Sequence, residues 1–395
     1  MKSNAKLKII ILITIEILFA LVPKITSTAD NSVITFDMEN LKTAAVTGKI
    51  HIDNNWTDAW SAGICSGNGT YSDPYVIEDL VIDAGGWGSG IFIENSDVYF
   101  RIENCTIYNA AGWMPPDPFD SGGIRLLHVH NSQLTNNNCS SNWVGILLQF
   151  SDNNTISENI VNNNSWIGMY IIESDNNIIS GNTVNNNAKF GMGIYYCFLN
   201  NISTNVLKNN NIVGIYPNTN SNITISRNTI INSSHGIYIA GDIYDNISGN
   251  DLHNNSENGL FIRAVNCIIS GNNASYNGNG IFLEGWWTWE SGANNTILGN
   301  IANYNNVGIR LENTNNNIIS GNSLIGNVKC IVEIGCSGNK FEDNEGCKYP
   351  KNTEPSLEYL PFILIFATAI IGISIFMILQ NHKMFKKSQE DLDFL

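Results

Sequence analysis

Basic side chains are scarce in this chain of 395 residues. It has 20 lysines and arginines against 35 aspartates and glutamates, for a formal net charge of −15, and no lysine occurs between Lys49 and Lys189. Proteins that bind nucleic acid need clustered cations to neutralise phosphates, so this composition argues against nucleic acid and against unassisted binding of acidic polymers. We expect neutral sugars, cations or other proteins as partners.

Metal-binding side chains are also few and scattered. The chain has 6 histidines, 7 methionines and 8 cysteines, and none of their spacings is typical of a zinc site. Copper sites use clustered His, Met or Cys ligands, whereas the only close histidine pair here is His128-x-His130. The sequence therefore predicts neither a bound metal nor a cofactor.

The Leu-x-x-Leu-x-Leu frame of leucine-rich repeats is absent, but another unit recurs about every 21 to 25 residues. Each copy has a Gly-Ile-aromatic-aliphatic tetrad, a polar turn, an aliphatic-Ser-x-Asn segment and a second Asn-rich turn. The first residue of each tetrad is called its anchor glycine. The anchors are Gly90, Gly123, Gly145, Gly168, Gly193, Gly214, Gly236, Gly259, Gly280 and Gly308, with Cys330 in the glycine position of a last copy.

Both halves of the unit have the pattern of short strands. In Gly236-Ile237-Tyr238-Ile239 the aliphatic residues alternate with an aromatic residue, which is the two-residue period of a strand. Such a repeat leaves no room for a crossover helix, so successive copies should stack as parallel coils with right-handed connections. The sequence predicts an all-β fold, a right-handed parallel β-helix of about 11 coils.

The Asn-Asn-x-Ile-Ser-x-Asn and Gly-Ile-x-Leu units, as in residues 176–182, resemble the β-helix repeats of NosD-type proteins in the pectate-lyase-like superfamily. The resemblance covers roughly residues 90 to 346 and implies the same fold. It also raises copper-site maturation as a function. Repeats of this kind serve binding modules, surface proteins and polysaccharide enzymes alike, so the resemblance does not choose among these functions.

The two ends of the chain carry targeting patterns. Three lysines precede an apolar run from Ile9 to Val22, and small residues at 27–29 suit signal-peptide cleavage before Asp30; an uncleaved anchor is the alternative. The uncharged run Tyr359–Leu379 is long enough to span a bilayer, and the lysines that follow it place the tail in the cytoplasm.

This pattern predicts a single-pass protein of the cell membrane whose N-terminal ectodomain lies outside the cell. The predicted segments are a signal peptide at 1–29, an N-terminal cap with the first strands at 30–88, the β-helix at 89–346, a stalk at 347–358, a transmembrane helix at 359–380 and a cytoplasmic tail at 381–395.

Cysteines gather near both ends of the predicted coil, where the apolar interior would otherwise be open. Cys65 and Cys105 lie near the first copy, and Cys330, Cys336 and Cys347 lie near the last. In an exported chain they can form disulfides that seal these ends, although the pairing stays open. Sequons such as the one at residues 201–203 permit N-glycosylation.

The position two residues after each anchor glycine forms a column that strand alternation turns away from the core. Exposed aromatic rings offer flat faces for sugars, so we predict a glycan-binding stripe; the alternative is that the rings only stiffen the sheet. The six consecutive aromatic residues of this column are Tyr170, Tyr195, Tyr216, Tyr238, Phe261 and Phe282.

Two copies are interrupted by longer segments, and insertions of this kind map to the surface of a solenoid. One insertion contains Trp286, Trp287 and Trp289, which we add to the predicted ligand-binding residues because exposed tryptophans favour contact with a partner. The alternative is that the tryptophans fold back as a local cover.

The other insertion, Asp117-Pro118-Phe119-Asp120, resembles the Asp-Pro-His-Asp motif of β-helical mannuronan C5-epimerases, with Phe119 where the motif has histidine. The resemblance implies an alternative function, a lyase or C5-epimerase acting on uronate polymers, which needs acid–base and cationic groups. The candidate catalytic residues under that alternative are Asp117, Asp120, Arg125, His128 and His130.

A further column lies seven residues after the anchor glycines. His130, Asp152 and Asp175 stand there in register, as a weak cation site or as a solvated edge of the turn. Taken together, the sequence favours a membrane-anchored extracellular β-helix protein with a non-catalytic binding or structural role and a glycan as ligand. A polysaccharide lyase or C5-epimerase and a NosD-like copper-maturation protein are the alternatives.

Overall fold

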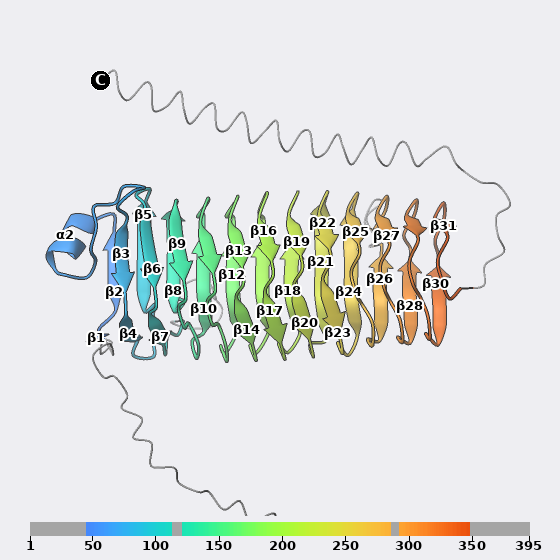
Figure 1. The fold of residues 1–395 in the computed structure, drawn as a ribbon, viewed down its shortest axis with the longest axis horizontal. Coiled ribbons are helices and arrows are strands. Elements are labelled where there is room, and N and C mark those ends of the chain that lie inside the picture. The colour runs from blue at the N-terminus through green and yellow to red at the C-terminus, as the bar shows by residue number, and fades with distance from the viewer. Residues whose placement is uncertain (1–44, 113–120, 286–291, 348–395) are drawn as a thin grey trace, which may run out of the picture. The chain divides into compact units, whose positions relative to one another are not determined.

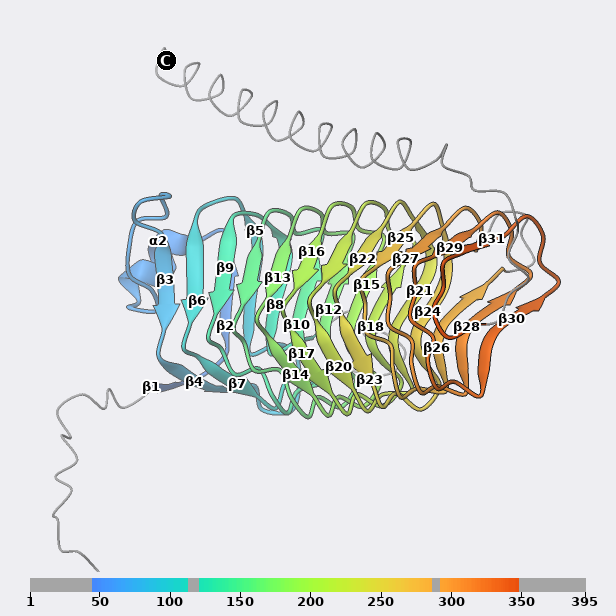
Figure 2. The same ribbon diagram turned by 45° about the vertical axis from the view of Figure 1, so that its right-hand side comes forward.

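The computed structural model describes residues 45–112, 121–285 and 292–347. Within them the chain winds as a stack of coils, and each coil adds one strand to each of two long sheets (Figure 1). Many coils also add a short strand or a single bridge on a third side. The turned view in Figure 2 shows the interior of the stack between these sides.

We name the sides sheet 1, sheet 2 and sheet 3 in the order in which the chain visits them from β2 onward. Sheet 1 contains β2 (Ile50–Asp53), β5 (Ile91–Ser96), β8 (Ile124–Val129), β10 (Val144–Gln149), β12 (Ile167–Ile172), β15 (Phe190–Tyr195), β18 (Val213–Asn218), β21 (His235–Ile243), β24 (Asn258–Val265), β26 (Asn279–Glu284), β28 (Val307–Glu312) and β30 (Lys329–Ile334). Sheet 2 contains β3 (Tyr75–Glu78), β6 (Phe100–Glu103), β9 (Ser132–Thr135), β11 (Thr155–Ser157), β13 (Ile178–Ser180), β16 (Asn201–Ser203), β19 (Thr224–Ser226), β22 (Asn246–Ser248), β25 (Ile268–Ser270), β27 (Thr296–Leu298), β29 (Ile318–Ser320) and β31 (Lys340–Glu342). Sheet 3 is in two parts, β1 (Ala45–Thr47), β4 (Leu80–Asp83) and β7 (Thr106–Tyr108), then β14 (Thr183–Asn185), β17 (Val206–Lys208), β20 (Thr229–Ile231) and β23 (Asp251–His253).

Equivalent positions of successive copies lie side by side in these sheets. Ile237 of β21 pairs with Leu260 of β24, and Ile247 of β22 pairs with Ile269 of β25, both in parallel. The predicted right-handed parallel β-helix of about 11 coils is therefore confirmed.

The core fills the space inside the coils. One coil contributes Ile237 and Ile239 from sheet 1, Ile247 from sheet 2 and Leu252 from sheet 3, all with no exposed surface. Burial of each such side chain stabilises the folded state by about 1.5 to 3 kcal/mol relative to leaving the side chain exposed. No coil can bury these residues alone, so the stability of each coil depends on its neighbours.

The anchor glycines are required by the close approach of successive coils. A Cβ on Gly168 would lie 2.6 Å from the carbonyl oxygen of Gly191. Cys330 takes this position in the last described coil, whose strand β30 pairs only with β28. With no further coil packed against it within the described residues, a side chain is tolerated there.

Asparagines form hydrogen-bonded ladders inside the turns. Asn205 is one example: its Oδ1 accepts from the backbone N–H of Asn182 at 2.9 Å, and its Nδ2 donates to the carbonyl of Ile179 at 2.9 Å and to Oδ1 of Asn228 at 2.9 Å. One ladder consists of Asn137, Asn159, Asn182, Asn205, Asn228, Asn250, Asn272, Asn300, Asn322 and Asn344, all buried. These amides satisfy backbone groups that water cannot reach.

Asparagine is common in turns because it tolerates left-handed backbone. That reason applies to a second, exposed set, such as Asn163 and Asn186, which both have φ of 57°. The buried ladder residues are a separate set with a different role.

Aromatic residues cover the first end of the core. Helix α2 (Trp56–Ser61) places Trp56 against Phe100, with ring centroids 4.7 Å apart, and its Nε1 donates to Oγ of Ser96 at 2.8 Å. Cys65 and Cys105 are buried free thiols. The prediction that cysteines seal this end is wrong, because a tryptophan on a short helix covers it instead.

Cysteines close the last coil, as predicted. Cys330 and Cys347 form a disulfide with their Cα atoms 5.7 Å apart, while Cys336 is a free thiol. The bond joins the edge strand β30 to the end of the described residues.

The predicted signal peptide, transmembrane helix and tail lie outside the described residues, as does the stalk beyond Cys347. In the part of the chain that is described, no helix has the length and apolar character that a membrane span requires.

Candidate functional site

The outer face of sheet 1 carries an apolar cluster separate from the core. Leu147, Tyr170 and Phe190 are buried within it, and Trp143 and Trp166 pack against it. A chain of rings continues from there along the sheet, with neighbouring centroids 4.5 to 5.9 Å apart. The rings are those of Trp143, Trp166, Tyr170, Tyr195, Tyr216, Tyr238, Phe261 and Phe282.

Tyr195 does not belong to the column in which the sequence placed it. Tyr170 pairs with Gly193, so the anchor glycine of this coil is Gly191 and not Gly193. The ring of Tyr195 lies beside the bare Gly193 and meets Tyr170 edge-on, with an interplanar angle of 77°. The ring of Tyr195 thus fills the gap that Gly193 leaves in the aromatic column, although Tyr195 itself belongs to the neighbouring outward column.

The aromatic column faces away from the core, but its first part is not an exposed stripe. Tyr170 is only 4% exposed, and burial raises the pKa of the phenols of Tyr170 and Tyr195 well above the ordinary value. Phe261 is 7% exposed, whereas Tyr216, Tyr238 and Phe282 are half-buried. The predicted open stripe is therefore wrong for Tyr170 and Phe261, because the rings bury each other's faces.

Charged side chains join the rings in the second half of the sheet. Nε of Arg263 donates to Oε2 of Glu284 at 2.6 Å, and its Nη1 donates to the hydroxyl of Tyr238 at 2.5 Å. The guanidinium lies 4.8 Å from the ring centroid of Phe261. Burial raises the pKa of the Tyr238 phenol, and the charge of Arg263 opposes that shift. Arg263 is thus held by a carboxylate, a phenol and two aromatic rings.

A second ion pair lies two strands further along. Arg310 pairs with Glu312, with Nε to Oε1 at 2.8 Å, and its guanidinium is 5.0 Å from the ring centroid of Phe282. Both arginines are therefore stacked on phenyl rings and fixed by carboxylates, so each guanidinium has a defined orientation.

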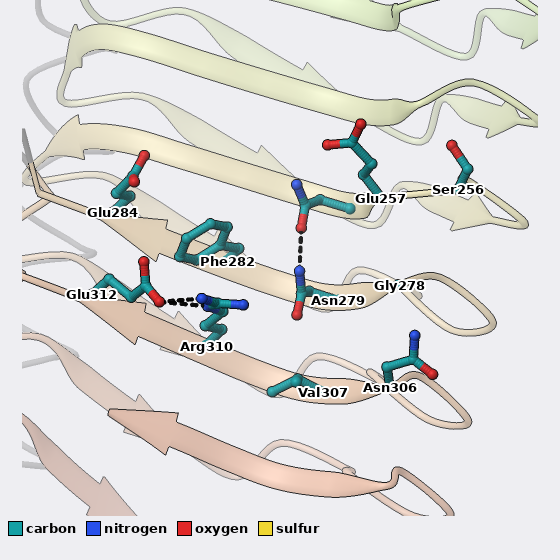
Figure 3. A pocket seen from close by; sticks show the side chains of 11 residues that line it. Ser256, Glu257, Gly278, Asn279, Phe282, Glu284, Asn306, Val307, Arg310 and Glu312 are labelled. Atoms are coloured by element: carbon teal, nitrogen blue, oxygen red, sulfur yellow. Dashed lines mark hydrogen bonds and ion pairs between the residues drawn. The ribbon is translucent and has the colours of Figure 1, made fainter. Parts of the chain in front are cut away.

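A groove of about 490 Å³ lies across β24, β26 and β28 at this place (Figure 3). Its lining combines amides, carboxylates, an arginine and an aromatic ring. The lining residues are Ser256, Glu257, Asn258, Gly278, Asn279, Phe282, Glu284, Asn306, Val307, Arg310 and Glu312.

A hydrogen-bonded chain orders the side chains next to the groove. Nδ2 of Asn279 donates to Oδ1 of Asn258 at 2.7 Å, and Nδ2 of Asn258 donates to Nδ1 of His235 at 2.9 Å. Burial lowers the pKa of His235, Glu257 raises it and Arg263 lowers it. Because Nδ1 of His235 accepts from Asn258, the neutral imidazole carries its proton on Nε2. This Nε2 lies 3.4 Å from the carboxylate of Glu257.

The sequence analysis missed Arg263, Glu284 and Glu312. Each follows its anchor glycine by four residues, so strand alternation puts all three in the outward column next to the aromatic one. The charged residues of this second outward column are the signal in the repeat that could have identified them.

The described catalytic candidates have separate partners. Nε of Arg125 donates to Gln149 at 3.0 Å, while His128 stacks on Phe150 with centroids 5.0 Å apart. Asp117 and Asp120 lie outside the described residues. The structure therefore does not bring Arg125 and His128 to one point.

His130, Asp152 and Asp175 stand in register, as predicted. Nδ1 of His130 accepts from the backbone N–H of Asp152 at 3.2 Å, and Oδ1 of Asp152 accepts from that of Asp175 at 2.7 Å. These side chains link one coil to the next at the turn. Among the residues with described positions, no three His, Cys, Asp or Glu side chains are arranged to hold a metal ion.

Trp286, Trp287 and Trp289 also lie outside the described residues. They follow Glu284 and Gly285 in the chain, directly after the strand that supplies Phe282 to the groove. Their assignment as ligand-binding residues stays a prediction.

The chain is similar to several solved structures at low sequence identity. The chain is similar to the Dettilon tailspike protein, with 18% identity, a TM-score of 0.49 and coverage of 65% of this chain and 61% of that one. It is similar to the A-module of the Azotobacter vinelandii mannuronan C-5 epimerase AlgE6, with 14% identity, a TM-score of 0.37 and coverage of 70% and 86%. It is also similar to DFA-IIIase from Arthrobacter chlorophenolicus A6, with 12% identity, a TM-score of 0.46 and coverage of 72% and 88%. The chain spans less than two thirds of the tailspike, and these likenesses concern the fold alone.

Two family models match the part of the chain that forms the coils. None of the curated protein sequences compared with the chain matches it significantly. Residues 62–230 match the family described as right handed beta helix region, and residues 195–346 match the family described as periplasmic copper-binding protein (NosD). Residues 62–346 therefore form a right-handed parallel β-helix, and residues 195–346 of it are similar to the NosD family.

Proposed function

We propose that the protein is a non-catalytic carbohydrate-binding module whose site is the groove over β24, β26 and β28. The groove supports this proposal because it combines amide and carboxylate groups with the ring of Phe282. Sugars present hydroxyls around an apolar ring, so a site that binds them needs both kinds of contact in fixed positions.

The favoured ligand is an uncharged glycan. Arg310 and Arg263 are each neutralised by a glutamate, and Glu257 adds a further negative charge at the groove. A uronate polymer would meet net negative charge there, on a chain whose formal net charge is −15. A neutral sugar meets no such repulsion and can accept a hydrogen bond from the Arg310 guanidinium that lines the groove.

We further propose that the β-helix is displayed outside the cell on a single membrane span. The similarity of residues 195–346 to a periplasmic family supports an exported location. The signal-peptide pattern at residues 1–29 and the apolar run at 359–380 support export and anchoring.

The test is binding of the full-length protein to an array of neutral and uronate oligosaccharides. Arg310→Ala removes the guanidinium over Phe282, and we expect the affinity for the bound glycan to fall about tenfold, equivalent to about 1.4 kcal/mol. The matched control is Arg125→Ala, because Arg125 occupies the same column and lies 4.6 Å from the ring centroid of Phe92.

Loss of binding in Arg125→Ala but not in Arg310→Ala would mean that the site lies near β8, the strand that follows the insertion at residues 117–120. Shortening or epimerisation of a uronate polymer by the wild-type protein would overturn the non-catalytic assignment.

A further inference from the structure

Two tyrosines form an isolated stack on the surface between sheet 3 and sheet 1. The rings of Tyr276 and Tyr304 lie 5.1 Å apart with an interplanar angle of 14°. Tyr276 is 59% exposed and Tyr304 is 53% exposed, so neither ring contributes to the core. Neither tyrosine lines the proposed groove.

Both tyrosines have a backbone conformation that is unfavourable for them. Their φ angles are 60° and 57°, in the left-handed region that Asn and Gly adopt more readily. The equivalent position, at the turn before the sheet 1 strand, is occupied in other coils by Ser141, Asn163, Asn186, Asn209, Asn232 and Asn254, and by Gly326 in the next coil.

Asparagine at this position also makes contacts that tyrosine cannot. Nδ2 of Asn209 donates to Oδ1 of Asn186 at 3.1 Å, and Nδ2 of Asn232 donates to Oδ1 of Asn209 at 3.1 Å. The tyrosine pair therefore gives up amide contacts and adopts strained backbone while staying exposed. The rings pack on each other, and the Tyr304 ring lies over Gly326, but both stay more than half exposed; strain retained at so exposed a position is typical of functional residues.

The pair stands at one end of the groove. Tyr276 precedes Gly278 by two residues, and Tyr304 precedes Asn306 by two residues; Gly278 and Asn306 both line the groove. Figure 3 shows Gly278 and Asn306 where the chain enters the strands, and Glu284 and Glu312 at the opposite end of the same strands. The groove and the pair thus lie on one line that follows the strand direction.

We propose that Tyr276 and Tyr304 form a second saccharide subsite that extends the groove over this turn. The ligand is then an oligosaccharide that runs parallel to the strands, perpendicular to the direction in which the coils stack. This inference rests on the proposed function. A strand of six residues spans about 20 Å, the length of about four pyranose rings, so the tyrosine pair contacts only longer ligands.

The exposed rings and phenol hydroxyls of the pair suit a neutral sugar. Aromatic rings pack against the apolar C–H faces of pyranoses, and phenol groups exchange hydrogen bonds with their hydroxyls. No charge is needed for that contact, which agrees with the neutral glycan proposed for the groove.

The test uses a variant that restores the residue found in other coils. In the double variant Tyr276→Asn/Tyr304→Asn, asparagine suits the left-handed backbone, so the protein should fold at least as well as wild type. The matched control is Tyr244→Asn. Tyr244 is also exposed and has φ of 61°, but it lies at the turn between sheet 1 and sheet 2.

The probes are size series of neutral glucan, mannan, xylan and galactan oligosaccharides with two to eight sugars. The affinity of the wild-type protein should rise about tenfold between four and six sugars in the series that it binds. The double variant should lose that rise and keep wild-type affinity for the short members, while the control keeps both.

The outcomes separate this inference from the proposed function. If Arg310→Ala loses affinity for all lengths and the double variant keeps the rise with length, the groove stands and the second subsite is wrong. If the wild-type protein binds no member of any series, both proposals are wrong. If the double variant loses affinity for the short members too, the pair is not a separate subsite.

Discussion

The outer face of sheet 1 is used differently in its two halves. Over β10 to β18, Tyr170 is buried among tryptophans and other tyrosines, and few of the outward side chains are charged. Over β21 to β28, the same outward columns contain Tyr238 and Phe282 together with two arginine–glutamate pairs and a groove. A single repeated position can therefore serve packing in one half and recognition in the other.

The charged residues make the difference. Rings that meet only rings bury their faces, as Tyr170 and Tyr195 do. An arginine stacked on a ring and held by a carboxylate keeps part of the surface polar and hydrated, which leaves a groove. The contrast predicts different consequences for equivalent substitutions in the two halves.

The largest expected effect comes from comparing Tyr170→Ala with Phe282→Ala. Tyr170 is 4% exposed, so its truncation should lower the free energy of unfolding by about 3 to 5 kcal/mol. Phe282 is half-buried, and its truncation should cost only about 1 to 2 kcal/mol. Denaturant unfolding of the full-length variants measures both values. Equal losses would mean that the two halves do not differ in packing.

A smaller effect is expected at a buried acidic pair where the two halves meet. Asp242 and Asp245 are 0% and 1% exposed and interact directly. Burial, and then the charge of Asp242, raises the pKa of Asp245 above its ordinary value. The folded protein thus holds a proton that the unfolded chain releases, so stability should fall as the pH rises from about 4 through neutrality.

Asp245→Asn removes this titration. It should stabilise the protein at pH 8 by about 2 kcal/mol, because the wild-type chain must take up a proton at Asp245 when it folds at that pH, whereas the amide of the variant is neutral in both states and still donates to Asp242. Thermal unfolding of wild type and variant from pH 4 to 8 measures the difference. A difference that stays constant with pH would show that Asp245 holds no such proton.

The smallest effect concerns the gap that Tyr195 fills. A Cβ at Gly193 would lie 3.1 Å from Cδ2 of Tyr170 and 3.1 Å from Cε2 of Tyr195. We expect Gly193→Ala to destabilise the protein by about 1 kcal/mol, because both rings must shift. Gly48→Ala is the control, since a Cβ there meets nothing within 4 Å. A neutral Gly193→Ala would mean that the ring of Tyr195 is not packed in that gap.

Much of the fold could be predicted because the repeat determines it. The anchor position of Gly168 and the strand Ile237–Ile239 are found where the sequence places them. The error at Tyr195 arose because Gly191 and Gly193 both fit the motif. The spacing from Gly168 to Gly214 is regular only if Gly191 is the anchor, so even coil length was the better guide.

The site was less predictable because it depends on contacts between columns. Strand alternation gives the direction of Tyr170, but its burial depends on Trp166, which directly precedes the same strand, and on Trp143, which precedes the strand of the preceding coil. The groove could have been anticipated from the charges at Arg263 and Glu284, which share one outward column. The ladder role of buried asparagines was hidden because exposed asparagines in the same turns have an independent reason to be there.

The most direct test of the account is the saccharide affinity of Phe282→Ala and Tyr170→Ala beside wild type, at a temperature where all three are folded. The account predicts that Phe282→Ala loses about tenfold in affinity, or about 1.4 kcal/mol, while Tyr170→Ala binds as wild type does. Absence of binding by the wild-type protein, or an affinity that follows Tyr170 and not Phe282, would contradict it.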